Sequence, residues 1–417
     1  MNHIRNPETL AAETHVSGGE SSELDCAIKA SKILIVDDQM VVRKLIEFYL
    51  TAGGYSNLIF AEDGDDALDA IETEAPDLVI LDLQMPRMGG FEVCEKLRAH
   101  PDYELLPILV QTAADSAEDR ARVFAAGATD MIGKPINDAE LRARVGIHLQ
   151  NRHMLNQLSV YRESMERELD IAREMQHGIM PGQKHLDKLK EMYGIDIRSH
   201  FETCDALGGD MWNVWPIDTR RMGFTIVDFT GHGVVASLNT FRFQSLVMSN
   251  GYLESGNQTD YIERISRRLH SMLAIGQFAT AIGGYIDFGE DVIRYVGAAG
   301  PKPFLVEPGG KTGRFLASEG RPLGMTRETT YEEREVPFPP GSSLFLYSDA
   351  LTETPDMVNP VYDDDRIAMA LTGGLQTGSH PFDALLADFV DRASGPLDDD
   401  LTLVMLSRPD DATGGGR

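Results

Sequence analysis

The sequence lacks a long apolar run and has few cysteines. No apolar run approaches the roughly 20 residues that a membrane-spanning helix needs, and the N-terminal stretch MNHIRNPETLAAETHVSGGESSELD has no apolar signal core. Its three cysteines, Cys26, Cys94 and Cys204, are far apart and form no C-x-x-C pair. This pattern excludes the usual zinc motifs and fits a reducing compartment. We therefore expect a cytoplasmic protein with no membrane partner.

Basic residues are also scarce. Lysine and arginine number 38 against 66 acidic residues, and the formal net charge is −28 at pH 7. No basic excess is available to neutralise nucleic-acid phosphates, so we expect no nucleic-acid partner and no DNA-binding output. The 42% hydrophobic and 25% charged composition is typical of globular proteins, and 417 residues predict two to three domains.

Residues 32–147 alternate strand patterns with helix patterns. KILIVDD, LVILDL and PILVQT are short apolar runs, and MVVRKLIEFYLTA is a helical pattern that stops at Gly53 and Gly54. Continuous apolar strands between helices predict an α/β fold with a parallel sheet covered on both faces. Ligands bind such sheets at the carboxyl ends of the strands.

Polar residues gather at these predicted strand ends. Asp37 and Asp38 end the first run, Asp82 ends another, Thr112 follows ILVQ, and Lys134 precedes a proline. A single aspartate after a strand is most often a helix N-cap. Three acids, a hydroxyl and an ammonium at one edge instead predict a site for a divalent cation and a phosphoryl group.

Residues 32–147 resemble a CheY-like receiver domain of response regulators, which is doubly wound around a five-stranded parallel sheet. The resemblance implies phosphorylation of Asp82 by a sensor histidine kinase or phosphotransfer protein. It also implies one Mg²⁺ bound by the acid pair, with Asp38, Asp82 and the backbone carbonyl of Gln84 as ligands. Asp37 completes the acid pocket. Magnesium prefers oxygen ligands of this kind.

The same resemblance assigns the remaining receiver positions. Thr112 and Lys134 are expected to contact the phosphoryl group, where a lysine offsets its charge. The bond between Lys134 and Pro135 is expected to be cis, as X-Pro bonds permit. The sequence departs from the family at Met131, where a switch tyrosine or phenylalanine is usual. Phosphorylation is expected to survive this change, whereas an aromatic switch is not implied.

A long helical pattern follows over residues 138–181. Apolar residues recur three and four apart at Leu155, Leu158, Met165, Leu169, Ala172 and Ile179, with Arg162 and Gln176 as polar breaks. This heptad-like spacing favours a parallel two-stranded coiled coil, and therefore a homodimer through receiver and coiled coil. The alternative is an amphipathic helix packed on its own chain. Pro181 ends the pattern.

From about residue 190, short strands with glycine and proline turns predict an α+β domain. Asp210 follows Gly208 and Gly209, and Asp228 ends the strand in GFTIVDFTGHG. Asp349 follows SSLFLYS, and Asp399 precedes the last predicted strand. One aspartate in a turn is usually an Asx cap. Four at strand ends, with no cysteine and histidine cluster, predict a site for Mg²⁺ or Mn²⁺.

Residues 165–407 resemble the SpoIIE branch of the PPM-type (protein phosphatase 2C-like) serine/threonine phosphatases. The matching segments, in order, are IAREMQHGIMP, GGD, DFTGHG, FATAIGGYID, AAGPKPFL, RPLGM, YSDALTE and DDDLTLV. The resemblance implies a β-sandwich core flanked by helices and two Mn²⁺ or Mg²⁺ ions.

The resemblance also gives each acid a role. Asp228 would bridge the two ions, and the backbone carbonyl of Phe229 would join the second. Asp349 and Asp399 would complete the first ion, and Asp210 would serve the second. Such a pair of ions activates water for in-line attack on a phosphate.

Other residues near these motifs have two interpretations. His232 is either a general acid or, more often in such turns, a structural residue. Asn213 stands where the family commonly has another aspartate, which leaves a further metal in doubt. Trp212 and Trp215 are expected to pack in the core or at its rim.

The sequence therefore predicts a multidomain protein. We expect a disordered polar tail over 1–30, a receiver over 31–148, a coiled-coil linker over 138–181, a phosphatase domain over 190–408 and a second disordered tail over 409–417. The predicted function is a phosphorylation-regulated phosphoprotein phosphatase of two-component signalling. By resemblance, its substrate is a phosphorylated STAS-type anti-anti-sigma factor. The alternative is a degenerate phosphatase that acts as a phosphorylation-gated adaptor.

Overall fold

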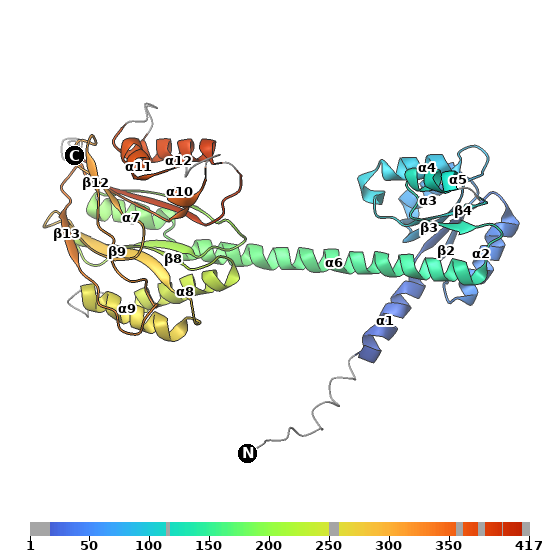
Figure 1. Ribbon diagram of the computed structural model, residues 1–417, viewed down its shortest axis with the longest axis horizontal. Helices are drawn as coiled ribbons and strands as arrows, with labels where there is room; N and C mark the ends of the chain where they lie inside the picture. Colours follow the sequence, from blue (N-terminus) through green and yellow to red (C-terminus); the bar gives the residue numbers. More distant parts are fainter. Residues whose placement is uncertain are drawn as a thin grey trace, which may run out of the picture. The chain divides into compact units, whose positions relative to one another are not determined.

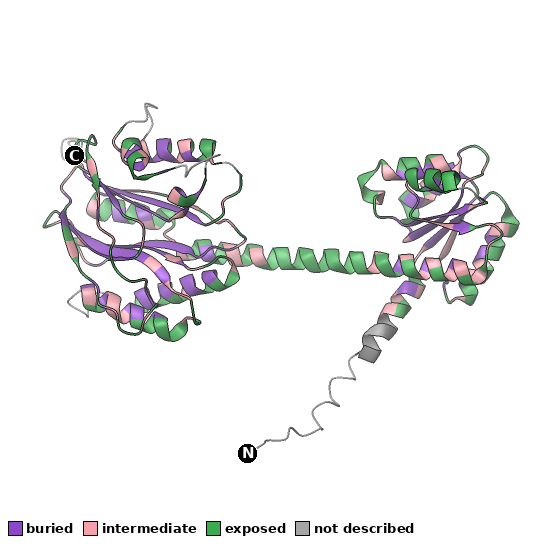
Figure 2. Ribbon diagram, viewed as in Figure 1, coloured by how far each residue is buried: buried purple, intermediate pink, exposed green. Residues whose placement is uncertain are grey.

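The computed structural model divides the chain into two units, residues 1–164 and 165–417 (Figure 1). It describes residues 17–113, 117–249, 258–355, 362–373, 380–393 and 395–410. Both units bury their strands between helices, and the middle of the long helix is exposed (Figure 2). No helix in these ranges has the length and apolarity that a membrane span requires.

The first unit contains a parallel sheet of five strands in the order β2-β1-β3-β4-β5. The strands are β1 (Ile33–Val36), β2 (Leu58–Ala61), β3 (Leu78–Asp82), β4 (Ile108–Thr112) and β5 (Asp130–Gly133). The helices are α2 (Met40–Ala52), α3 (Gly64–Glu74), α4 (Gly90–Arg98), α5 (Ala117–Ala125) and the start of α6, with a short 3-10 helix η2 (Pro101–Tyr103). The predicted doubly wound receiver fold is confirmed.

Each face of this sheet has its own apolar core. Val36, Val79 and Val110 pack with α3, α4 and α5 on one face. Ile80 and Leu109 pack with α2 and α6 on the other. The alternation of side chains along each strand produces these two cores, because successive residues point to opposite faces.

An additional helix, α1 (Ser17–Ala30), precedes the receiver sheet. The expectation of a disordered tail over 1–30 is therefore wrong for residues 17–30, while 1–16 lie outside the described residues. Ile28 is buried in the core beneath α2 and α6, with Leu24 packed against it. The Lys29 Nζ lies 4.0 Å from the centre of the Tyr55 ring. Two apolar residues four apart are enough to dock this helix, although its sequence is otherwise polar.

The predicted linker is a single helix, α6 (Asp138–Ile179). Its exposed middle carries Leu155, Leu158 and Met165, as the heptad pattern requires. Its last turns behave differently. Gln176 is fully buried and Ile179 packs against an apolar core of the second unit. Treating Gln176 as a polar break in a helix seam was therefore wrong, and pairing of two α6 helices stays a prediction.

The second unit contains two antiparallel sheets of five strands. Their orders are β13-β10-β9-β8-β7 and β12-β11-β14-β15-β6. The strands are β6 (Asp196–Glu202), β7 (Asp210–Pro216), β8 (Arg221–Phe229), β9 (Ala279–Asp287), β10 (Val292–Ala298), β11 (Phe304–Val306), β12 (Gly313–Phe315), β13 (Arg334–Pro337), β14 (Ser343–Tyr347) and β15 (Leu401–Ser407). A core that includes Trp212, Phe224, Leu346 and Val404 joins the two sheets.

Helices cover the outer faces of this sandwich. Side chains of α8 (Val234–Ser249) and α9 (Gln258–Met272) pack on the sheet that contains β7 to β10. Those of α11 (Asp364–Leu371) and α12 (Pro381–Arg392) pack on the other sheet. The remaining helices are α7 (Gln183–Tyr193) and the short α10 (Ala350–Glu353). The predicted β-sandwich flanked by helices is confirmed.

Candidate functional site

The receiver acids meet at the carboxyl edge of the parallel sheet. Asp37 directly follows β1, Asp82 is the last residue of β3, and both are buried. Asp38 is exposed beside them. Each of the three offers a carboxylate oxygen, and these oxygens all lie within 4.8 Å of one another. The strand-end pattern thus brings the three acids together as expected.

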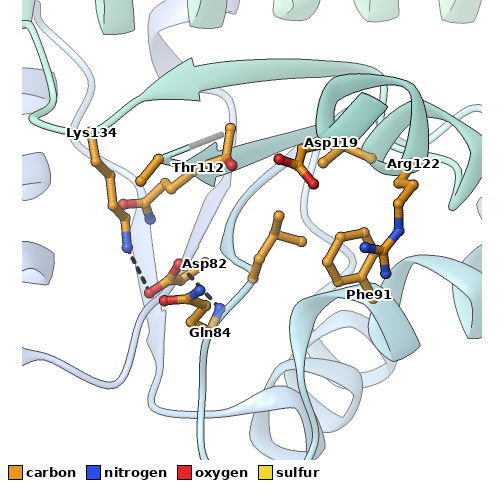
Figure 3. A pocket seen from close by; sticks show the side chains of 11 residues that line it. Asp82, Gln84, Phe91, Thr112, Asp119, Arg122 and Lys134 are labelled. Atoms are coloured by element: carbon orange, nitrogen blue, oxygen red, sulfur yellow. Dashed lines mark hydrogen bonds and ion pairs between the residues drawn. The ribbon is translucent and has the colours of Figure 1, made fainter. Parts of the chain in front are cut away.

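Lys134 lies against the same carboxylates. Its Nζ is 2.7 Å from Asp82 Oδ2 and 3.9 Å from Asp37 Oδ2. The backbone N–H of Gln84 donates to Asp82 Oδ1 at 3.3 Å. The peptide bond between Lys134 and Pro135 is cis, as predicted. Lys134, Asp82, Gln84 and Thr112 line a pocket of about 360 Å³ (Figure 3).

The acid trio fits a magnesium ion. Burial raises the pKa of Asp37, and repulsion from Asp82 acts in the same direction, against hydrogen bonding from Gln39 and attraction to Lys134. Asp37 Oδ2 is buried and accepts no hydrogen bond from the described residues. A divalent cation would satisfy this oxygen and offset the repulsion, and carboxylate oxygens are the ligands that magnesium prefers.

Met131 occupies the position of the usual switch aromatic. It is half-buried on β5 and packs against the core formed with α3, α4 and α5. Phe91 packs against the same core. Met131, where the sequence departs from the family, is therefore part of the apolar packing of the receiver and lies next to the strand end that carries Lys134.

The second unit gathers the other four predicted acids. Asp210 on β7 and Asp228 on β8 are directly opposite each other in the antiparallel register. Asp349 follows β14, and Asp399 precedes β15. Thr402 Oγ1, on β15, donates to Asp210 Oδ2 at 2.6 Å, and this hydrogen bond links the two sheets at this end of the sandwich.

Mutual repulsion shows that these acids form one electrostatic cluster. Burial raises the pKa of Asp228 to about 7, and repulsion from Asp349 and Asp399 adds to the effect. Burial, with repulsion from Asp399, raises the pKa of Asp349 to about 6. Burial raises the pKa of Asp210 well above its usual value, with Asp228 as the next contributor. The cluster therefore concentrates negative charge that is only partly offset by hydrogen bonds.

This donor set fits hard divalent cations. Every side chain in it offers oxygen, which Mg²⁺ and Mn²⁺ prefer. No three of the four carboxylates bring one oxygen each within 4.8 Å of one another. These four carboxylates are thus more widely spaced than the three receiver acids, and the raised pKa values of Asp210, Asp228 and Asp349 indicate where positive charge would be most stabilising.

Two glycines allow the backbone to approach these acids closely. A Cβ at Gly208 would lie 2.6 Å from Asp400 Oδ2. A Cβ at Gly209 would lie 2.8 Å from the backbone oxygens of Phe229 and Gly231. Glycine is therefore required at both positions, because a side chain at 208 would displace the Asp400 carboxylate and one at 209 would displace the carbonyl of Phe229, which is the expected metal ligand.

Asp400 is a site residue whose role the sequence reasoning missed. It is buried, and its carboxylate accepts hydrogen bonds from the backbone N–H groups of Cys204 at 2.9 Å and Gly209 at 2.5 Å. Asp400 thereby fixes the loop that leads into Asp210, while its neighbour Asp399 is exposed and repels Asp228 and Asp349. The run of adjacent acids in DDDLT was the sequence signal available for these two roles, loop support by Asp400 and proposed metal binding by Asp399.

Gln176 was also missed as a site residue. Its buried side-chain amide hydrogen-bonds with the backbone of Gly208. Arg173, one turn earlier on α6, donates from Nε to the carbonyl of Ala206 at 3.0 Å. The end of α6 therefore supports the loop before Asp210. The lead-in segment IAREMQHGIMP, whose match to the family was noted in the sequence, supplied the only signal.

Cys204 lies beside this cluster. Its sulfur is within 4.8 Å of carboxylate oxygens of Asp399 and Asp400. Burial raises the pKa of the Cys204 thiol to about 12, and repulsion from Asp400 contributes. The thiol is therefore protonated at neutral pH and is a poor metal ligand in this state.

The structure shows the surroundings of His232, Asn213 and the two tryptophans. His232 is exposed, and its Nδ1 lies 3.4 Å from Asp205 Oδ2, outside the acid cluster. Asn213 is buried and donates from Nδ2 to Gln244 Oε1 at 2.9 Å. Trp212 is a core residue between the sheets, and Trp215 packs at the edge of the neighbouring core. The packing predicted for both tryptophans is confirmed.

Comparison with known proteins agrees with the receiver geometry. The sequence pattern described as "Response regulator receiver domain" matches residues 33–146. Response regulator MprA of Mycolicibacterium vanbaalenii is 46% identical over 114 residues, which are 27% of this chain and 48% of that protein. The chemotaxis protein CheY4 of Vibrio cholerae is 34% identical, over 28% of this chain and 96% of that one, with a TM-score of 0.27. The chain therefore contains a response regulator receiver domain.

The second unit matches a different family. The pattern described as "Stage II sporulation protein E (SpoIIE)" matches residues 218–409. The solved SiaA-PP2C domain of Pseudomonas aeruginosa has a TM-score of 0.51 and 20% identity, and covers 59% of this chain and 98% of that one. At this identity the likeness shows the fold alone. The chain spans about half the length of curated relatives such as MprA.

Proposed function

We propose that this chain is a metal-dependent protein serine/threonine phosphatase whose activity is controlled by phosphorylation of its receiver. The observation that carries the proposal is the cluster of Asp210, Asp228, Asp349 and Asp399, in which burial and mutual repulsion raise the pKa of the first three. Holding buried acids so close together is costly unless cations compensate them. An adaptor without catalysis has no need of such a cluster.

The proposed roles follow the predicted assignments. Asp228 would contact both ions, Asp349 and Asp399 would complete the first, and Asp210 with the backbone carbonyl of Phe229 would serve the second. When bound, Mn²⁺ or Mg²⁺ supplies the positive charge that lowers the pKa of water and neutralises phosphate oxygens. Thr402 holds the Asp210 carboxylate in one orientation through its 2.6 Å hydrogen bond.

In the receiver, Asp82 is the proposed phosphoacceptor. Asp38, Asp82 and the carbonyl of Gln84 would hold one Mg²⁺, with Asp37 completing the acid pocket. Lys134, already 2.7 Å from Asp82 Oδ2, would pair with the phosphoryl oxygens, as would the hydroxyl of Thr112. The donor of the phosphoryl group would be a sensor histidine kinase or phosphotransfer protein of a two-component system.

The proposed substrate is a phosphorylated STAS-type anti-anti-sigma factor in a cytoplasmic partner-switching pathway. This part rests on the resemblance of the second unit to the SpoIIE branch. A homodimer formed through the receiver and α6 is the proposed assembly, and its support is the exposed apolar side of α6.

The test is hydrolysis of a phosphoserine protein by the full chain, measured with Mn²⁺, with Mg²⁺ and with EDTA. We expect Asp228→Asn and Asp349→Asn each to lower kcat by at least about 100-fold, because each removes a proposed ligand charge. Asp383→Asn is the matched control, since Asp383 is half-exposed and pairs only with Arg198 among the described residues. Retained activity in Asp349→Asn would refute the metal assignment. Inactive wild-type protein with every metal, with and without beryllofluoride, would favour the adaptor.

A further inference from the structure

Gln111, on β4, is a fully buried polar residue. Its exposed fraction is 0%, and neither its Oε1 nor its Nε2 has a partner among the described residues. Buried amides are almost always hydrogen-bonded, because water has been removed from both polar atoms. An apolar side chain would avoid this cost, so the amide calls for an explanation beyond packing.

The position of Gln111 in the sheet identifies its neighbours. It is in register with Asp82 on β3 and with Ile132 on β5, so the three side chains share one face. Leu109, two residues earlier, is buried in the apolar core on that face. An apolar residue at 111 would simply extend this core. The chain instead places an amide beside the proposed phosphoacceptor.

Gln111 also lines the pocket that contains the phosphoryl-binding residues. Asp82, Thr112 and Lys134 line the same pocket of about 360 Å³, and Figure 3 shows these three side chains directed into it. The unsatisfied amide thus borders the space into which a group carried by Asp82 would project.

We propose that Gln111 is a further phosphoryl-binding residue of this receiver, whose Nε2 donates a hydrogen bond to the group carried by Asp82. The inference rests on the proposed phosphorylation of Asp82. A phosphoryl group brings three strong acceptor oxygens, and the amide has two donor hydrogens without partners. Its Oε1 also has no partner among the described residues, and the ammonium of Lys134, whose Nζ is 2.7 Å from Asp82 Oδ2, lines the same pocket.

Gln111 therefore shifts the equilibrium between the unmodified and the phosphorylated state of the receiver. In the unmodified state its amide is buried and unsatisfied, which destabilises the fold. In the modified state the same amide is satisfied. A group that interacts differently with two states shifts their equilibrium by that difference. Gln111 therefore favours retention of the phosphoryl group at the expense of the stability of the unmodified receiver.

The experiment compares Gln111→Met, Gln111→Glu and the control Leu109→Met in the full chain. Methionine has nearly the same shape as glutamine but no amide, and glutamate keeps the shape but replaces the donor with an oxygen. Leu109→Met changes packing on the same face without touching a polar group. Thermal unfolding of the receiver and titration with beryllofluoride and Mg²⁺ are measured, together with the half-life of the phosphoryl group after labelling with acetyl phosphate.

We expect opposite effects on the two states in Gln111→Met. Its receiver should unfold about 4 °C higher or more without ligand, because an unsatisfied buried amide is gone. Its half-saturating beryllofluoride concentration should rise about tenfold, and the phosphoryl half-life should shorten, because a hydrogen bond to a charged group is lost. Gln111→Glu should weaken beryllofluoride binding further. Leu109→Met should bind it like wild type.

Two results would overturn the inference. If Gln111→Met and Gln111→Glu both bind beryllofluoride like wild type, the amide does not contact the group on Asp82. If Gln111→Met unfolds at a lower temperature and binds beryllofluoride normally, the amide has only a structural role. Failure of the proposed phosphorylation gives a different result. If neither wild type nor Asp82→Asn is labelled by acetyl phosphate, Asp82 is not phosphorylated, and the inference about Gln111 loses its basis as well.

Discussion

The side-chain amide of Gln176 forms two hydrogen bonds with the backbone of Gly208. Gln176 Nε2 donates to the Gly208 carbonyl at 2.7 Å, and the Gly208 N–H donates to Gln176 Oε1 at 3.1 Å. Gln176 belongs to α6, and Gly208 lies two residues before Asp210. The last turns of the long helix are therefore joined to the loop that positions an acid of the proposed metal site.

This pairing predicts a specific effect of Gln176→Met. The substitution leaves two buried backbone groups of Gly208 without partners, at a cost of about 1–3 kcal/mol. We expect the phosphatase rate to fall at least about tenfold, with a higher metal concentration at half-maximal activity, because the loop no longer holds Asp210. Gln183→Met is the matched control, since its amide bonds Asp187 at an exposed site. An unchanged metal requirement in Gln176→Met would contradict this role.

Without metal, the stability of the phosphatase unit should fall as the pH rises, which is opposite to the usual effect of native carboxylates. The folded pKa values of Asp228 and Asp349, about 7 and about 6, lie above the usual value of 3.8. The folded state thus retains protons that the unfolded chain has released. This contribution to stability is complete below pH about 4 and is lost as the pH rises through about 6 to 7.

The measurement is calorimetric unfolding of the full chain in EDTA between pH 4.5 and 8. We expect the transition temperature of the phosphatase unit to fall as the pH rises. Asp228→Asn should flatten the part of this slope near pH 7, because asparagine does not titrate. Addition of Mn²⁺ at pH 7.5 should restore the stability. The same slope in Asp228→Asn and wild type would show that the acid cluster is not its source.

We expect Gly209→Ala to damage the site by a steric clash alone. The added Cβ would lie 2.8 Å from the Phe229 and Gly231 carbonyl oxygens, closer than such contacts normally allow. We expect loss of most activity and a destabilisation of about 1–3 kcal/mol from the forced shift. Gly178→Ala is the control, because a Cβ at this helical position has no atom within 4 Å. Alanine there should stabilise the helix slightly, and equal effects of both substitutions would contradict the steric account.

The exposed side of α6 predicts how the receiver controls the phosphatase. Met154, Leu158, Tyr161 and Met165 are exposed and recur four, three and four residues apart. Pairing of two chains along this side would let phosphorylation change the register or order of the helix. Since Gln176 joins the same helix to Gly208, such a change would reach Asp210. Activation is the expected sign.

The test is the doubly substituted chain with Leu158→Lys and Met165→Lys. We expect it to sediment as a monomer and to lose the response of phosphatase rate to beryllofluoride. Val160→Lys is the control, since Val160 is equally exposed but lies off this side of the helix. A preserved response in the monomeric variant would remove helix pairing from the mechanism. Absence of any response in wild type would remove control by the receiver.

The sequence predicted what depends on local pattern. Apolar runs that end in acids placed Asp37 and Asp82 at one sheet edge, because parallel strands share their carboxyl edge. Paired glycines and strand-end acids likewise indicated Asp210 and Asp228. Helix α1 was missed because its docking depends on only two apolar residues, Leu24 and Ile28, in a polar segment.

Roles that depend on distant partners were not predictable. The backbone of Cys204 donates to Asp400, 196 residues away, and no local pattern marks this pair. Gln176 looked like a defect in a helix seam until its partner Gly208 was placed beside it. Gln111 looked like one polar residue at the end of a strand, and its burial without a partner is a property of the folded sheet alone.

Strand β15 has a consequence for how the phosphatase unit is produced. It lies between β14 and β6, and its register pairs Leu401 with Glu202 and Ser407 with Asp196. Pairing across such a long stretch of chain is slow, because a large loop must close first. Asp399 lies two residues before this strand, so a nascent chain on the ribosome has no complete acid cluster until the residues around the start of β15 have emerged. Partly synthesised chains therefore lack the complete set of acids that the proposed metal site requires.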